Sequence, residues 1–123
     1  MFLRDLEIEM SDSNTSPDMK WDVPEGSTSS EQLEYFRRYC KDHPDVVWTS
    51  AEAHRYDGLT LFRQDGDTLH VMRFTAALCG FEGTGPSAAI SILTEAGFGH
   101  FEHIEHRILY KYERDPNPRR FTK

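Results

Sequence analysis

The sequence lacks most of the features that identify a function by themselves. It has two cysteines, Cys40 and Cys79, and they do not form a CxxC pair. So few cysteines exclude a disulfide framework and suit free thiols in the cytoplasm. No apolar run approaches the roughly 20 residues of a membrane-spanning helix, and no secretory signal is visible. We therefore expect a cytoplasmic protein that does not enter a membrane.

Basic charge is also scarce. The chain has 14 Lys and Arg against 21 Asp and Glu, a formal net charge of −7. A protein that binds the phosphate backbone of nucleic acid needs a basic face, so the balance argues against that class. The excess acid lies in residues 1–34, where nine acids accompany two bases, and the remainder of the chain is neutral.

Motifs of known enzyme classes are missing as well. There is no Gly-Lys-Ser/Thr phosphate loop, no H-E-x-x-H zinc motif and no G-x-S-x-G nucleophile turn. Nothing near either cysteine lowers its pKa in an obvious way, which disfavours a thiol nucleophile. The sequence implies no cofactor and no metal, and it leaves open whether the protein is an enzyme.

The 123 residues suffice for one domain. Residues 1–27 are acidic, and their polar stretch 11–18 has no apolar period, which predicts a poorly ordered arm. The arm's apolar residues suit at most a short amphipathic strand or turn: Phe2, Leu3, Leu6 and Ile8. We expect a single domain over 28–115 and a tail over 116–123, where prolines interrupt regular structure.

Local signals predict two helices. The first spans 29–42, because Thr28 and Glu31 have the spacing of a capping box and a His-Pro pair follows the apolar stripe. The second spans 86–96, with proline at its first position and Gly97 at its left-handed end.

A β-hairpin is predicted over residues 58–78, with its turn at Asp65-Gly66. A three-residue loop over 64–66 is favoured over a two-residue loop, since it gathers four aliphatic residues on one face: Leu59, Leu61, Leu69 and Val71. The other face then carries Thr60, Phe62, His70, Met72 and Phe74. Of these, Phe62, Met72 and Phe74 form a candidate interface.

The segment His100–Glu113 is predicted as a strand from its β-prone residues, although its apolar spacing also fits a helix. Residues 46–48 form a second β-prone run. The element order indicates an α+β fold, a small antiparallel sheet made of the hairpin 58–78 and the C-terminal strand, with two helices packed on one face.

Two segments contain candidate ligand-binding residues. Glycines before the second helix direct backbone N–H groups toward a helix N-terminus, which suits a small anion. This site comprises Gly83, Thr84, Gly85 and Ser87, with His70 or His103 as a neighbouring acid or base. The second segment, His100–His106, holds three histidines and two glutamates. Its ordinary interpretation is a solvated surface, and metal binding is the alternative.

These observations favour a small interaction or regulatory domain that self-associates as a homodimer through its sheet. The alternative is a small-molecule or anion-binding domain, with or without enzymatic activity, at the Gly-rich start of the second helix. The expected partners are protein, including a second copy, or a small anionic ligand.

Overall fold

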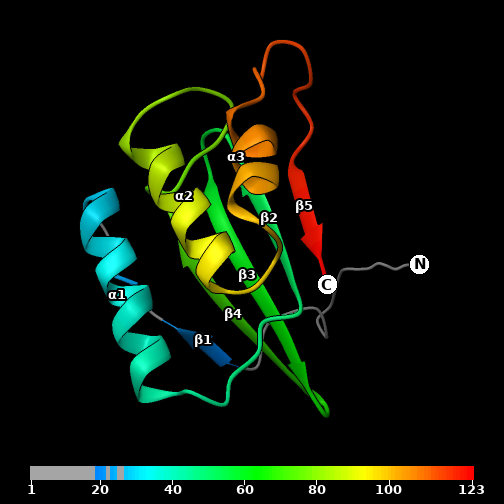
Figure 1. Cartoon of the computed structure of the whole chain (residues 1–123). Helices are drawn as coiled ribbons and strands as arrows, with labels where there is room; N and C mark the ends of the chain where they lie inside the picture. The colour runs from blue at the N-terminus through cyan, green and yellow to red at the C-terminus, as the bar shows by residue number, and fades with distance from the viewer. Residues whose placement is uncertain (1–18, 22, 25–26) are drawn as a thin grey trace.

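The computed structural model describes residues 19–21, 23–24 and 27–123. It confirms the α+β class with three helices and one five-stranded sheet, in the strand order β1-β4-β3-β2-β5. The predictions for residues 1–18 lie outside the described residues. Figure 1 shows α1, α2 and α3 on the same side of the sheet.

Helix α1 spans Ser29–Asp42, as the capping box predicts. The Thr28 Oγ1 accepts from the Glu31 N–H at 3.1 Å, and the Glu31 carboxylate accepts from the Thr28 N–H at 2.8 Å. Buried Phe36 contacts the ring of Phe74 edge-on, with centroids 5.9 Å apart, and so joins the helix to the sheet.

Helix α2 spans Thr84–Glu95, starting two residues before the predicted proline. Gly97 lies just beyond its end in the left-handed conformation, as predicted, with a φ of +88°. The N–H of Phe98 then donates to the carbonyl of Leu93 at 3.1 Å, the long hydrogen bond of a Schellman motif.

Strands β3 (Gly58–Asp65) and β4 (Thr68–Phe74) form the predicted hairpin, but the predicted register is wrong. Asp65 pairs with Thr68, so the loop is the two-residue Gly66-Asp67. Gly66 adopts φ +61°, which suits a tight hairpin turn. This loop shifts β4 along β3 relative to the predicted register. As a result, each β4 side chain faces the side of the sheet opposite to the predicted one.

In the observed register, alternate residues of the sheet face the helices and are buried: Ala51, Ala53, Leu59, Leu61, Met72, Phe74 and Phe121. They pack against buried residues of the three helices to form the core, among them Phe36, Leu93, Ile104 and Ile108.

The C-terminal segment is a helix and not a strand. Helix α3 spans Phe101–Leu109, and Ile104 and Ile108 are both fully buried on its inner face. Residues four apart share one face of a helix, so this spacing outweighs the β propensity of the segment. The predicted short strand over 46–48 is also absent, and β2 (Ser50–His54) begins after it.

Both edges of the sheet come from segments predicted to lie outside the domain. Strand β5 (Arg119–Thr122) falls in the expected tail 116–123 and pairs with β2 in antiparallel orientation. Strand β1 (Met19–Trp21) falls in the expected arm and pairs with β4 in parallel orientation.

A buried arginine holds β5 in place. Arg119 is 5% exposed, and its guanidinium donates to backbone carbonyls of the segment that follows α3 and of the end of α3. The Nη2–Tyr110 O distance is 2.9 Å and the Nε–Arg107 O distance is 3.2 Å. Asp115 and Asn117 carbonyls accept from Nη1. The Arg107 and Tyr110 carbonyls lie at the C-terminal, negative end of the α3 dipole, which suits a cation.

Candidate functional site

The face of the sheet opposite the helices carries no helix in the described part of the chain (Figure 1). At its centre Phe62 pairs with Ser50 on β2 and with Val71 on β4. Phe62 and Val71 are half-buried, and Leu69 lies diagonally beside them in the same state. The face therefore has an apolar centre of three side chains.

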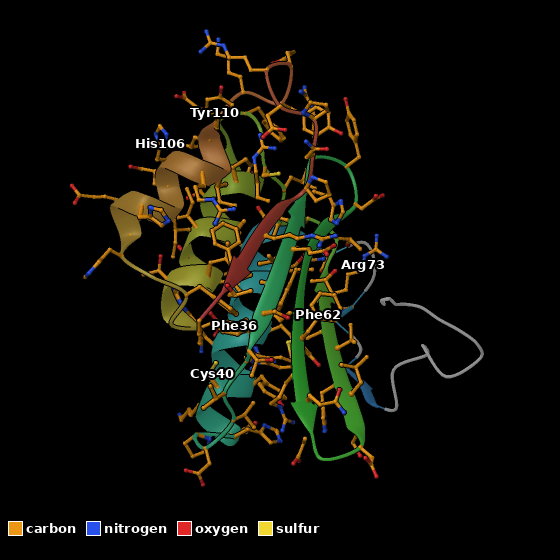
Figure 2. The ribbon with its side chains drawn as sticks, turned by 90° about the vertical axis from the view of Figure 1, so that its right-hand side faces the viewer. Phe36, Cys40, Phe62, Arg73, His106 and Tyr110 are labelled. Atoms are coloured by element: carbon orange, nitrogen blue, oxygen red, sulfur yellow. The ribbon has the colours of Figure 1, made fainter. Side chains whose placement is uncertain are left out.

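Charged residues form a rim around this apolar centre. We call the apolar centre and its rim together the open face. On one side the Glu52 carboxylate contacts the Arg120 Nε at 3.1 Å and the His54 Nε2 at 3.2 Å. On the other side Arg73 donates through Nε and Nη2 to the carbonyl of Asp57, at 3.1 and 2.9 Å. Figure 2 shows Arg73 on the side of the sheet away from the helices.

Only one of the three predicted interface residues belongs to this open face. Met72 and Phe74 are fully buried beneath the helices, because the observed register turns both toward the core. Phe62 lies on the opposite face of the sheet from them. The hypothesis of an interface on a sheet face therefore still includes Phe62. Its neighbours on that face are Leu69 and Val71 and not Met72 and Phe74.

The Gly-rich segment borders a shallow hollow between the first turns of α1 and α2. Its volume is about 340 Å³, and it is lined by Ser29, Ser30, Leu33, Gly83, Thr84, Ser87 and Ala88. Gly83 is the N-cap of α2, and no side chain caps this helix and no acid lies in its first turn. By contrast, α1 satisfies its own N-terminus through Thr28 and Glu31.

Gly85 has a packing role in this region. A Cβ at this position would lie 2.9 Å from the carbonyl oxygen of Ala76, so only glycine lets α2 approach the loop after β4 so closely. The residue is buried and does not line the hollow. Of the predicted ligand residues in the loop, Gly83, Thr84 and Ser87 reach the hollow.

Neither predicted histidine joins them. His70 is the third residue of β4, near the hairpin turn, which lies at the opposite end of the sheet from the start of α2 (Figure 1). It is 8% exposed and stands opposite Arg63. His103 is exposed on α3 and does not line the hollow either.

The histidines of 100–106 lie on α3 or at its N-cap and are exposed. Within residues 19–21, 23–24 and 27–123, no cluster of three or more His, Cys, Asp or Glu is arranged to hold a metal ion. No helix in this same part of the chain is long and apolar enough to cross a membrane.

Arg55 forms a cluster that sequence reasoning missed. Its guanidinium carbon lies 5.4 Å from the ring of Tyr56, 5.7 Å from Phe81 and 5.4 Å from Tyr112, and its Nη1 lies 3.3 Å from the Glu113 carboxylate. The contacts join the β2–β3 turn to two distant loops. No local spacing signals such a cluster, since its members lie far apart in the chain.

The two thiols are unsuited to nucleophilic chemistry. Cys79 is fully buried and Cys40 is half-buried. Burial raises the pKa of both thiols, so both are protonated near neutral pH.

Comparison with known proteins found no matching protein family, no matching curated protein and no matching solved structure.

Proposed function

We propose that the protein is a small interaction domain that associates with a second copy of itself through the open face of its sheet. The observation that carries this proposal is the apolar centre at Phe62, Leu69 and Val71, with a rim of both charge signs. A two-fold symmetric contact places one patch against itself. The apolar centres then meet, and the acid Glu52 of one copy can face basic residues of the other.

The size of the surface indicates a weak contact. Strands about 4.8 Å apart with a rise of about 3.4 Å per residue give a face of about 20 by 20 Å. That is about 400 Å² per copy, half of the roughly 800 Å² that each partner contributes to a standard stable interface. We therefore expect reversible dimers in the micromolar range. Two free cysteines suit a reducing compartment, and a cytoplasmic location is part of the proposal.

A pair of matched variants tests the proposal. Phe62→Glu places a charge at the centre of the open face, whereas Phe101→Glu places one on α3, where the native side chain is already 51% exposed. Sedimentation equilibrium should show that Phe62→Glu dimerises more weakly than the native chain. Phe101→Glu should dimerise as strongly as the native chain. Far-UV circular dichroism checks that both variants fold. Equal dimerisation of both variants would refute the role of the open face.

A second candidate function, binding of a small anion, is favoured by the uncapped N-terminus of α2. No side chain caps this helix, and Ser29, Thr84 and Ser87 line the hollow at its start; an N-terminus of this kind attracts phosphate or carboxylate. Ser87→Asp would supply the negative charge internally. Millimolar phosphate should raise the melting temperature of the native chain and not that of Ser87→Asp. No response in the native chain would eliminate this candidate.

A further inference from the structure

Among the described residues, none pairs with the outer edge of strand β5. It is the last strand of the sheet in the described part of the chain, and β2 is its sole neighbour there (red arrow, Figure 1). An edge strand exposes backbone N–H and C=O groups to which another extended chain can pair. Such an edge can accept a further strand.

The charge on β5 determines which kind of strand can pair with its outer edge. Arg120 is on the open face with its side chain 75% exposed, whereas Lys123 lies over the Phe98 ring on the helix side. Pairing β5 with β5 of a second copy would bring the two Arg120 side chains onto the same face of the ladder, and like charges across a ladder are destabilising. An acidic strand is favoured instead.

The chain contains a segment of matching pattern. Residues 5–10, Asp-Leu-Glu-Ile-Glu-Met, alternate acidic and apolar side chains without interruption and lie outside the described residues. In a strand, alternate side chains point to opposite faces. If the apolar set lies beside Phe121 and extends the core face, Glu7 and Glu9 lie beside Arg120 on the open face.

The distance between the two sheet edges favours a segment from another molecule. Strands β1 and β5 are four strand spacings apart, about 19 Å at 4.8 Å per spacing. Residues 11–18 connect the acidic segment to β1. Eight residues span about 27 Å only when they are fully extended. That leaves little length for a path that must also pass over a face of the sheet.

We propose that residues 5–10 of one copy add as a strand to β5 of a second copy, and that the exchange is reciprocal. This inference rests on the proposed self-association. It adds to the dimer a second contact, between residues 5–10 of one copy and β5 of the other. The exchanged strands enlarge an interface that the open face alone leaves small.

Charge reversal in the full-length chain tests the exchange. Glu7→Lys/Glu9→Lys alone and Arg120→Glu alone should each weaken dimerisation about tenfold, since both equivalent junctions lose cross-strand ion pairs. Arg38→Glu, which reverses another exposed arginine on α1, is the matched control and should leave dimerisation unchanged. Fluorescence of buried Trp48 verifies that each variant is folded.

Mixing the two variants is the decisive step. In the heterodimer the reversed segment of one copy meets the reversed β5 of the other, and the remaining junction pairs a native segment with a native β5. The mixture should therefore recover native affinity. Variants that dimerise like the native chain, or a mixture that gains nothing over its components, would overturn the exchange. Because Arg120 also lies in the rim of the open face, recovery in the mixture is the result that separates the exchange from the open-face contact, which Phe62→Glu tests.

Discussion

Replacing Arg119 by methionine should destabilise the fold without touching the open face. Methionine keeps most of the apolar stem but removes the guanidinium that donates to four backbone carbonyls at the end of α3 and in the following loop. Since Arg119 is 5% exposed, water cannot fully replace the lost donors.

The magnitude follows from the exposure of the acceptors. A hydrogen bond from a charged donor contributes about 1.5–3 kcal/mol, so four would give at least about 6 kcal/mol if every carbonyl stayed dry. Three of these carbonyls belong to loop residues that water can reach, since Tyr110 and Asn117 are exposed and Asp115 is partly exposed. We expect a net loss of about 3 kcal/mol, a large fraction of a typical 5–15 kcal/mol stability.

Urea unfolding followed by Trp48 fluorescence measures this loss. Arg119→Lys keeps the charge but has fewer donors in a different geometry. This variant should recover about half of the free energy of unfolding that Arg119→Met loses. Arg120→Met is the control, because this neighbouring side chain is 75% exposed and makes one ion pair, with Glu52; its expected cost is below about 1 kcal/mol. A cost below about 1 kcal/mol for Arg119→Met would refute the assigned role.

Glycine and cysteine variants test two further features. Gly58→Ala should be far more destabilising than Gly66→Ala: both positions have positive φ, but a Cβ at Gly58 would meet the Phe74 carbonyl oxygen and one at Gly66 would meet nothing within 4 Å. Chemical denaturation should give about 1 kcal/mol for Gly66→Ala and at least twice that for Gly58→Ala; equal values would contradict the contact. In thiol titration at neutral pH, Cys79 should stay unmodified in the folded protein and Cys40 should react slowly, because burial raises both pKa values. Rapid modification of Cys79 under native conditions would contradict its burial.

The helices that sequence analysis predicted correctly are those with local termination signals. Thr28 and Glu31 define the start of α1 over one turn, and Gly97 defines the end of α2. Each signal lies within a few residues, so it can be recognised without knowledge of any tertiary contact. The position of the hairpin was predicted for the same reason, from the turn at Gly66.

The errors concern properties that depend on distant residues. The hairpin register was inferred by grouping aliphatic side chains, but the core instead takes Met72 and Phe74 because helices cover that face. Strand β5 follows two prolines, which suit the position before a strand as well as a tail. Its pairing with β2, nearly 70 residues earlier, leaves no local trace.

The candidate site was predictable only in part. The idea of an uncovered sheet face containing Phe62 stands as a proposal, whereas its neighbours on that face follow from the register. Gly83, Thr84 and Ser87 border a common hollow because they are neighbours at the N-cap and first turn of α2. His70 could not be excluded from that hollow by sequence, since its distance from α2 is set by the length of the β4 strand.

Sedimentation equilibrium of the native full-length chain tests the central claim most directly. Over loading concentrations from about 1 µM to 1 mM, the range of weak interfaces, the average mass should rise from the 14.3 kDa of one chain toward twice that value. The rise should follow a single monomer–dimer equilibrium. A mass that stays at 14.3 kDa at every concentration would contradict self-association through the sheet.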